Sequence, residues 1–512
     1  MNISRRTALA GLATTAVASQ LPTGTARAEA ASPAWKDIPP GQRKTLLRWA
    51  RDTWRSLDAM SHPSTGLVAD NIDGELSTRS GYTSPTNIGG LLWSALVARE
   101  LGILSAADAS YRIKLTLASL ARMERHEPSG MYYNWYDENT GALLHTWPEN
   151  GNPIDPFVSS VDMGWLGAAL WVVANGDPSN RAAALALFEP MRWDVFFDRD
   201  FARKPGANYG GFYTSRPNRD GVVEKVPMNG VGGDPVWYTA THHYDTAISE
   251  ARMVTYLGIM RGQIPAGAYF TTWRTFPEDW TWPEMPPVGE DRSYYGVDVY
   301  EGAHTYRGMH IVPGWGGSMF EELMPDLFVP EAEWGPRSWG VNHPLHVRAQ
   351  REHGLLDARY GYWGFSPCSN PAGGYREYGL DMLGLNPEGY FSDQEKTDYH
   401  WDNPPQTYGD GVVTPHAGFL GMMYEHKEGL RNLQKIETEL RCYGKGGFFD
   451  AASTRSGQVA RRYLSLDQSM VMGALGNILL PGGMRRWFAT AEVEKTLRPV
   501  IGVEVFGAGL VR

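Results

Sequence analysis

Hydrophobic positions recur at helical spacing along almost the whole chain. About a dozen segments carry apolar residues at i, i+3, i+4 and i+7, the spacing of one face of an α-helix. The predicted helices cover residues 42–58, 87–103, 106–125, 159–175, 180–190, 244–261, 315–327, 343–353, 413–425, 427–442, 464–480 and 490–497. The pattern therefore predicts an all-α protein.

Long connections separate many of these helices. Residues 126–158, 203–242, 265–314 and 360–412 are rich in Gly, Pro and aromatic residues. Connections of this length are usually functional or carry short strands of their own, so we expect the functional site and some short β-hairpins on one rim. Helices that alternate with long loops are typical of an (α/α)6 barrel, a toroid of paired helices.

The N-terminus has the features of an export signal. Arg5 and Arg6 precede a short apolar run, and an A-x-A type cleavage site follows at 26–28. We therefore predict a twin-arginine signal peptide over 1–28, a secreted or periplasmic protein, and a single domain over 29–512. The alternative for the first segment is an ordinary N-terminal helix.

Charge and cysteine content narrow the choice of partners. The formal net charge is -10, and acidic and basic residues are interspersed without a basic stripe, which argues against nucleic acid and anionic lipid. No later apolar run is long enough to span a bilayer, so we expect no membrane anchor.

The two cysteines leave two alternatives. Cys368 and Cys442 either form one disulfide or are two buried thiols. The oligomeric state stays open.

Aromatic residues favour a carbohydrate ligand. The chain has 19 Trp, 25 Tyr and 17 Phe but only 20% charged residues. Flat rings with polar edges suit the faces and hydroxyls of sugars. The chain has no GxGxxG before a helix, no Walker loop and no G-x-S-x-G elbow, and we expect no cofactor. The adjacent His242 and His243 do not share a helix face, so we assign no metal.

Several segments occur in the order found in a known family. They are TSPTNIG at 83–89, VSSVDMGWL at 158–166, YDTAISEAR at 244–252, RGQIP at 261–265, GGSMFE at 316–321, LMP at 323–325, YWGFS at 362–366, GYR at 374–376, VTPHA at 413–417 and LDQ at 466–468. Together they resemble the glucoamylase-like family that contains bacterial endo-β-1,2-glucanases and the cyclisation domains of cyclic β-1,2-glucan synthases. The resemblance implies an (α/α)6 barrel and glycoside hydrolysis without a nucleotide, flavin or obligatory metal.

Glu250 is the first candidate for catalysis. Hydrolysis of a glycoside needs one carboxylic acid to protonate the leaving oxygen and a second carboxylate to activate water or attack the anomeric carbon. Apolar neighbours in the predicted helix 244–261 favour partial burial of Glu250, which would raise its pKa and keep a proton available. The resemblance matches Glu250 to the Glu of the family's Ser-Glu-Ala-Arg segment. The alternative is a structural salt bridge to Arg252 or another cation.

Two more carboxylates are candidates for the same reaction. Glu321 has apolar neighbours and could orient the substrate or the catalytic acid. Asp162 is a candidate base, although it could equally be a first-turn acid favoured by the helix dipole. For Asp467, the alternatives are charge complementarity at a helix start and a hydrogen bond to sugar hydroxyls.

The segment after Phe365 and Ser366 bears on stereochemistry. In the cyclisation-domain relatives, which resemble retaining enzymes, a nucleophilic Glu follows this segment, whereas Pro367 stands here. Proline cannot act as a nucleophile, so we expect an inverting reaction with an activated water. That reaction requires carboxyl groups about 6.5–9.5 Å apart.

Substrate binding is assigned to the remaining residues of these segments and to nearby aromatic and polar residues. The candidates are Thr83, Asn87, Trp135, Tyr244, His304, Trp315, Trp363, Tyr375, Arg376, Asp467 and Gln468. The aromatic residues would stack on sugar rings, although each could equally belong to the core. The sequence thus favours a secreted hydrolase of a β-linked glucan, with β-1,2-glucan first. A polysaccharide lyase on a similar toroid and a non-catalytic glycan-binding protein are the alternatives.

Overall fold

The computed structural model describes most of the chain. The described residues are 37–200, 206–217, 224–226, 228, 231–239, 243–276, 285–385, 401–403, 405 and 407–511. The predicted signal peptide and His242 lie outside them. None of the helices in these ranges combines the length and apolar character needed to cross a membrane.

Six helices follow one another as neighbours in space. They are α6 (Arg252–Met260), α4 (Ser160–Gly176), α2 (Pro85–Glu100), α12 (Ser465–Leu479), α10 (Pro415–Met422) and α7 (Met319–Leu323). Of these, α2, α4, α10 and α12 are buried along nearly their whole length. A helix that is apolar all round must lie inside the protein, and these four form its centre.

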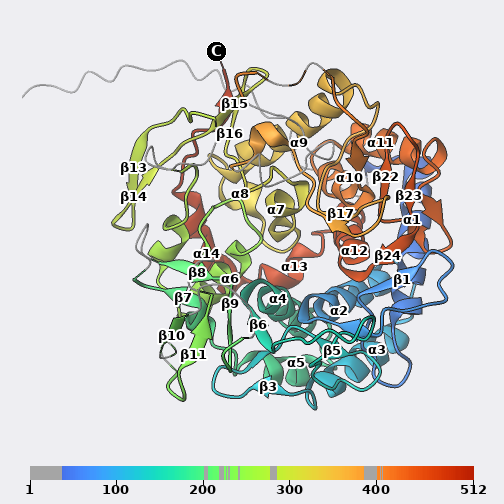
Figure 1. Ribbon diagram of the computed structural model, residues 1–512, viewed down its shortest axis with the longest axis vertical. Coiled ribbons are helices and arrows are strands. Elements are labelled where there is room, and N and C mark those ends of the chain that lie inside the picture. The colour runs from blue at the N-terminus through green and yellow to red at the C-terminus, as the bar shows by residue number, and fades with distance from the viewer. Residues whose placement is uncertain are drawn as a thin grey trace, which may run out of the picture.

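Other helices cover this centre from outside. They are α1 (Pro40–Met60) on α12, α3 (Ala106–Leu120) on α2, α5 (Arg181–Phe188) and the short α13 (Arg485–Phe488) on α4, α14 (Ala491–Gly502) on α6, α11 (His426–Thr438) on α10, and α9 (Trp339–Glu352) on α7. The short helix α8 (Glu331–Trp334) lies beside α9. Most of them bury one face only, as expected for surface helices. Figure 1 shows α1 beside α12, so two segments far apart in the sequence are neighbours in the fold.

The helix predictions are largely confirmed, with two corrections. The predicted helix 244–261 begins only at Arg252, because the residues before it pair as extended backbone. The predicted helix 315–327 contains only α7 and the 3-10 turn Pro325–Leu327. The pattern missed α8 and α13, which have four residues each and are too short to show a helical period.

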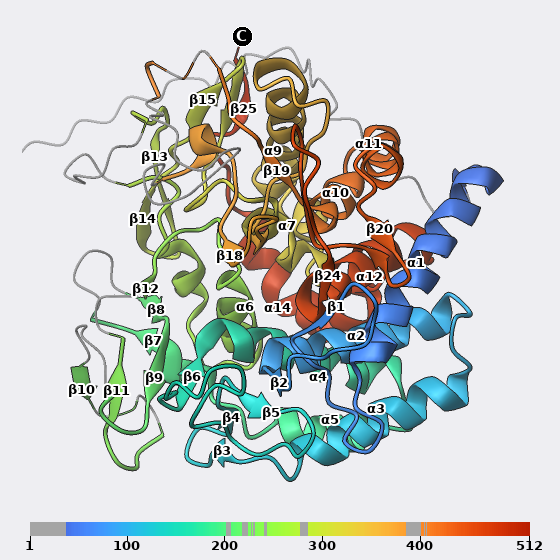
Figure 2. The ribbon, with the colours of Figure 1, turned by 45° about the vertical axis from the view of Figure 1, so that its right-hand side comes forward.

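Short antiparallel sheets correct the all-α prediction. Larger groups are β6 (Phe157–Ser159) with β9 (Gly211–Tyr213), β11 (Val236–Tyr238) and β10 (Glu224–Val226); β7 (Phe197–Asp198), β8 (Ala207–Tyr209) and β12 (His243–Tyr244); β15 (His304–Tyr306), β16 (Met309–Ile311) and β25 (Gly509–Leu510); and β19 (Val412–Val413), β22 (Ala451–Ser453) and β23 (Val459–Ala460). The pairs are β1 (Asn71–Asp73) with β24 (Arg462–Leu464), β2 (Tyr82–Thr83) with β5 (Tyr136–Asp137), β3 (Arg125–His126) with β4 (Met131–Tyr132), β13 (Asp291–Tyr294) with β14 (Val297–Tyr300), β17 (Cys368–Ser369) with β18 (Tyr375–Arg376), and β20 (Tyr443–Gly444) with β21 (Gly447–Phe448). Figure 2 shows β7 to β11 gathered away from α1. The predicted hairpins therefore exist, and the long connections carry more strand than expected.

Serine caps place candidate site residues at the starts of central helices. The side chains of Ser84, Ser159 and Ser318 accept hydrogen bonds from the backbone N–H groups of Asn87, Asp162 and Glu321, respectively. An N-cap fixes the first helical turn and satisfies one of its free N–H groups. Each of these three candidate residues therefore lies in a rigid first turn.

Close helix packing gives a stability prediction at Gly167. A Cβ at this position would lie 2.4 Å from the Trp193 ring, so α4 and the Trp193 segment must separate to admit it. We expect Gly167→Ala to lower the free energy of unfolding by about 1–3 kcal/mol, measured by urea unfolding. Gly41→Ala is the control, because nothing lies within 4 Å of its added methyl group, and it should be neutral or stabilise the first turn of α1. Equal stability of the two variants would contradict this packing.

Candidate active site

The backbone before α6 is extended and holds Glu250 in a turn. Thr246 pairs with Trp273, and Ile248 pairs in parallel with Gly314. These bridges use the backbone groups that a helix would need, so α6 cannot begin before them. Glu250 therefore stands in the turn just ahead of α6, not inside a helix as predicted.

The surroundings of Glu250 favour its protonated form on balance. Its side chain is partly buried, and Trp165 Nε1 donates to its Oε2 at 2.6 Å. Burial raises the pKa of Glu250 to about 8; the Trp165 hydrogen bond lowers it, while the charges of Asp162, Glu321 and Glu377 add to the rise. Since burial dominates, Glu250 carries a proton at neutral pH.

Arg252 does not pair with Glu250, so the salt bridge between these two residues that the sequence allowed does not form. Its Nε and Nη2 donate to Glu331 at 2.6 and 2.9 Å. Its remaining N–H groups donate to the carbonyl oxygens of Ser249, Glu321 and Glu322, at 2.9, 2.6 and 2.5 Å. Arg252 thus ties the Glu250 turn to α7.

Glu321 lies beside the N-cap of α7. Its Oε2 accepts from Ser318 Oγ at 3.1 Å and from the N–H of Gly316 at 3.4 Å. Burial raises the pKa of Glu321 to about 7, and these hydrogen bonds oppose the rise. This reciprocal cap fixes the carboxyl group next to the Glu250 turn.

Asp162 is held by hydrogen bonds from neighbouring elements. Thr86 Oγ1 in α2 donates to its Oδ1 at 2.6 Å. When the Asn134 amide is turned so that its nitrogen faces Asp162, that nitrogen donates to Oδ2 at 2.7 Å and to Oδ1 at 3.2 Å. Burial raises the pKa of Asp162, and the Thr86 hydrogen bond opposes it. Asp162 lies in the first turn of α4, and its negative charge contributes to the raised pKa of Glu250.

A second acidic group lies at the start of α12. Burial raises the pKa of Asp467 to about 7, and burial together with the charge of Asp467 raises that of Asp450 well above its usual range. His416 Nδ1 lies 3.3 Å from Asp467 Oδ2, and the N–H of Ser369 donates to Asp450 at 2.6 Å. Asp450 was missed in the sequence, because nothing local marks it as buried beside another carboxyl group.

Within the described residues, two groups of side chains approach closely enough to share a cation. In the first, His416, Asp450 and Asp467 bring one ligand atom each within 4.8 Å of one another. Burial and the charge of Asp467 raise the pKa of Asp450, which favours its neutral form. The second consists of Asp326, Glu331 and His343, and Arg485 and Arg252 form ion pairs with its carboxylates.

Several predicted binding residues lie inside the protein instead. Asn87 donates to Asp70 at 2.9 Å, and Gln468 donates to the Phe448 carbonyl at 3.1 Å. His304, Trp363 and Thr83 are all at most 1% exposed. Burial lowers the pKa of His304 to about 4, and Trp363 packs where Gly421 leaves room for its ring. Their closely packed neighbours leave these side chains little surface for a ligand.

Other predicted binding residues reach the surface. Tyr375 is 55% exposed, while Arg376, Tyr244, Trp135 and Trp315 are partly buried. Trp135 packs edge-on against Tyr82 and Trp147, and Trp315 packs edge-on against Phe276. Exposed aromatic faces beside carboxyl groups are suitable for a polar ring such as a sugar.

Glu377 was also missed, although it directly follows the GYR segment at 374–376. It is exposed, and its negative charge contributes to the raised pKa values of Glu250 and Glu321. Its position next to Tyr375 and Arg376 was the available signal in the sequence. The site thus contains four carboxyl groups, from Asp162, Glu250, Glu321 and Glu377.

The cysteine question is settled for both residues. Cys368 and Cys442 are buried, free thiols. Burial raises the pKa of Cys368 well above its usual range, so it has little thiolate character at neutral pH. Of the two alternatives from the sequence, two buried thiols is correct.

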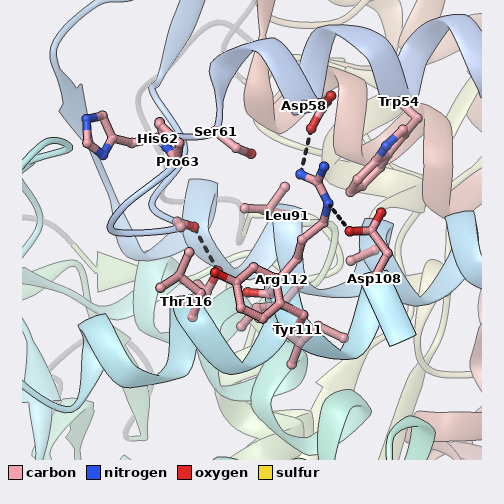
Figure 3. Close-up of a pocket in the computed structure, with 15 residues that line it drawn as sticks. Trp54, Asp58, Ser61, His62, Pro63, Leu91, Asp108, Tyr111, Arg112 and Thr116 are labelled. Atoms are coloured by element: carbon pink, nitrogen blue, oxygen red, sulfur yellow. Dashed lines mark hydrogen bonds and ion pairs between the residues drawn. The ribbon is translucent and has the colours of Figure 1, made fainter. Parts of the chain in front are cut away.

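A separate cavity of about 440 Å³ lies between α1, α2 and α3. Figure 3 shows its wall of Trp54, Leu91 and Tyr111, with Arg112 between Asp58 and Asp108. None of the predicted site residues lines it. It is therefore distinct from the carboxyl group cluster around Glu250.

The raised pKa of Glu250 predicts a pH-dependent stability. Between pH 4.5 and about 8 the folded protein keeps a proton on Glu250 that the unfolded chain has released, so stability falls as pH rises through this window. We expect Glu250→Gln to remove this pH dependence. The free energy of unfolding of the variant, relative to that of the wild type, should be higher at pH 8 than at pH 5 by about 3 kcal/mol. Urea unfolding at both pH values measures it. Glu494→Gln, at an exposed ion pair with Arg498, should show no such gain.

Comparison with known proteins identifies relatives of both halves of the chain. Residues 242–491 match the Glycoamylase family model, described as "Putative glucoamylase", and residues 48–196 match a family described only as proteins of unknown function. The cyclic beta-(1,2)-glucan synthase NdvB of Rhizobium meliloti is 28% identical over 86% of this chain. The chain spans 18% of that relative's length.

Solved structures share the fold. The endo-beta-1,2-glucanase from Chitinophaga pinensis, in complex with sophorotriose and glucose, is 16% identical with a TM-score of 0.59, covering 89% of this chain and 97% of that one. A mutant endo-beta-1,2-glucanase from Talaromyces funiculosus, in complex with beta-1,2-glucan, is 13% identical with a TM-score of 0.61, covering 91% and 92%. Residues 242–491 of the chain are therefore similar to the glucoamylase-like family, and the chain shares the fold of these solved structures.

Proposed function

We propose that this protein is a glycoside hydrolase that cleaves a β-linked glucan, with β-1,2-glucan as the favoured substrate. The observation that carries the proposal is the setting of Glu250. Its carboxyl group is partly exposed, accepts a hydrogen bond from Trp165 and lies near other carboxyl groups, and burial raises its pKa to about 8. A proton held at neutral pH is what a general acid needs in order to release a sugar leaving group.

The relatives support the choice of linkage. A β-1,2-linked glucan appears in the name of the synthase from Rhizobium meliloti and in the complex of the Talaromyces funiculosus enzyme. The Chitinophaga pinensis enzyme is also named as a β-1,2-glucanase. Because these relatives agree on the linkage, β-1,2-glucan is the first substrate to test.

The order of the central helices supports an (α/α)6 barrel. The helices α6, α4, α2, α12, α10 and α7 are neighbours in that order, and Arg252 at the start of α6 bonds to α7, which would close the ring. Candidate residues stand at the starts of these helices, as with Glu250 before α6, Asp162 in α4, Glu321 in α7 and Asp467 in α12. Helix starts that meet at one rim would bring these side chains into one cleft.

The proposed reaction follows from the roles of these groups. Glu250 gives its proton to the bridging oxygen while that oxygen leaves the anomeric carbon. Trp165, through its N–H, fixes the orientation of the Glu250 carboxyl group. Since Pro367 offers no nucleophile, we favour inversion, in which a carboxylate activates water on the opposite face of the sugar. Asp162 is the base candidate from the sequence.

The N-terminal segment supports export of the protein. The paired arginines, apolar run and cleavage site within 1–28 support transport by the twin-arginine pathway. A secreted or periplasmic enzyme would meet extracellular or periplasmic glucan there.

Activity and stereochemistry test the function directly. We expect the wild type to release reducing sugar from linear or cyclic β-1,2-glucan, and proton NMR to show the α-anomer first, because inversion of a β-linkage gives α. Glu250→Gln should lose about 10²–10⁴-fold in kcat while still binding substrate. An unsaturated product absorbing near 235 nm would instead identify a lyase, and binding without turnover in the wild type would identify a glycan-binding protein.

The hydrogen bond from Trp165 predicts a shift in the pH profile. This bond stabilises the charged form of Glu250, so Trp165→Phe should raise the pKa further and move the alkaline limb of kcat/KM to higher pH. Trp171→Phe, in the same helix, loses a similar hydrogen bond to the Phe488 carbonyl and is the matched control. If the alkaline limb of kcat/KM stays near pH 8 in Trp165→Phe, as in the control Trp171→Phe, the result argues against Glu250 as the acid.

A further inference from the structure

The cavity between α1, α2 and α3 has an apolar floor and an exposed rim. Leu91, Leu92 and Ala95 of α2 form part of the floor and are at most 5% exposed. Tyr111 of α3 is 63% exposed, and Asp58 of α1 is exposed as well. The volume of about 440 Å³ falls within the range of about 300–1,000 Å³ that is usual for small-molecule sites. The outer layer of helices thus contains a hollow of the size of a ligand site.

The charged groups of this cavity disfavour a charged ligand. Arg112 Nη1 lies 2.6 Å from Asp58 Oδ1, and Arg112 Nε lies 3.4 Å from Asp108 Oδ1. The two carboxylates outnumber the single guanidinium group, so an anion such as phosphate is repelled. A cation has to compete with Arg112, which already holds one oxygen of each carboxylate. The balance of charge therefore favours a neutral ligand.

Several polar atoms of the cavity are available to such a ligand. Among the described residues, no hydrogen bond reaches Asp58 Oδ2, Asp108 Oδ2 or the Tyr111 hydroxyl group. The N–H of Ser64 donates to His62 Nδ1 at 3.4 Å, so the neutral His62 ring carries its hydrogen on Nε2. Figure 3 shows His62 and Asp58 on different sides of the cavity. Hydrogen-bond acceptors and a donor around an apolar floor suit hydroxyl groups, which donate and accept.

A sugar ring combines the two properties that this lining requires. Its C–H groups form apolar faces, and its hydroxyl groups form a polar edge. Arg112 already lies over the Trp54 ring, 5.9 Å from its centroid, so Tyr111 is the aromatic ring of the cavity that is left for stacking. A purely apolar ligand would remove water from the carboxylates without replacing its hydrogen bonds, which costs free energy.

We propose that this cavity is a second glucan-binding site, which holds a short segment of a β-glucan chain outside the active site. The proposal rests on the substrate class proposed above for the active site. None of the candidate active-site residues lines the cavity, so it binds the chain without cleaving it. A polymer held there has a raised local concentration at the active site, because its second binding event is intramolecular. The connection is short, since the first turn of α2 carries Thr86, which donates to Asp162.

Binding is tested by methyl NMR with a β-1,2-linked glucotriose as the probe. The Glu250→Gln variant is used, so that the probe is not cleaved during the titration. We expect the methyl resonances of Ile113, which lines the cavity, to shift and to saturate. Tyr111→Ala should weaken this binding about three- to tenfold, as for loss of an aromatic contact, and its exposure makes it tolerant of substitution. Tyr295→Ala is the matched control, because Tyr295 is 53% exposed and does not line the cavity.

A kinetic measurement tests whether the cavity assists hydrolysis. The polymer occupies both sites with one chain, whereas the shortest oligosaccharide that is cleaved binds each site as a separate molecule. The ratio of kcat/KM for the polymer to that for the shortest oligosaccharide should therefore fall by up to about tenfold in Tyr111→Ala. The same ratio should stay unchanged in Tyr295→Ala. An unchanged ratio in Tyr111→Ala would overturn the assisting role.

The outcomes separate this proposal from the hydrolase function. Wild-type turnover without a shift of the Ile113 methyl resonances overturns the second site and leaves the hydrolase intact. A saturating shift without wild-type turnover on any β-glucan keeps the site and overturns the hydrolase. Unchanged affinity in Tyr111→Ala overturns the placement of the sugar in the cavity. Glucosamine that binds there more tightly than glucose, and less tightly as salt is added, overturns the neutral ligand class.

Discussion

The arrangement of the site depends on the guanidinium group of Arg252. Five N–H donors are available on an arginine, and here they reach the Glu331 carboxylate and the carbonyl oxygens of Ser249, Glu321 and Glu322. Although burial acts to raise it, the charge and hydrogen bonds of Arg252 bring the pKa of Glu331 down to about 2. The ion pair therefore stays charged inside the protein. A lysine could not span these partners, because it has a single donor atom.

This anchoring directs the charge of Arg252 away from Glu250. The same sequence segment contains a glutamate and an arginine two residues apart, but the fold gives them different partners. Arg252 turns inward to Glu331, and Glu250 accepts from the indole N–H of Trp165 and lies near the charges of other carboxyl groups. Burial without a counter-charge raises the pKa of an acid, whereas a salt bridge would have lowered it. The chemistry proposed for the site follows from that separation.

Helix capping and packing hold the remaining groups. Serines at the starts of α2, α4 and α7 fix the first turns that carry Asn87, Asp162 and Glu321. Glycines within the central helices permit close contacts, as where Gly167 meets the Trp193 ring. The same packing buries several carboxyl groups and raises their pKa values, so they favour their neutral form. The folded state therefore becomes less stable as pH rises.

The sequence by itself determined most of the helices and the aromatic connections and singled out Glu250 as a candidate, because helical periodicity and apolar neighbours are local signals. It could not decide that residues 245–249 are extended, since their pairing partners at Trp273 and Gly314 are distant in the chain. Tertiary structure alone placed Trp363, His304 and Gln468 inside and brought Glu377 and Asp450 beside other carboxyl groups. Burial and charge proximity are properties of the assembled fold, and a single residue's neighbours along the chain do not specify them.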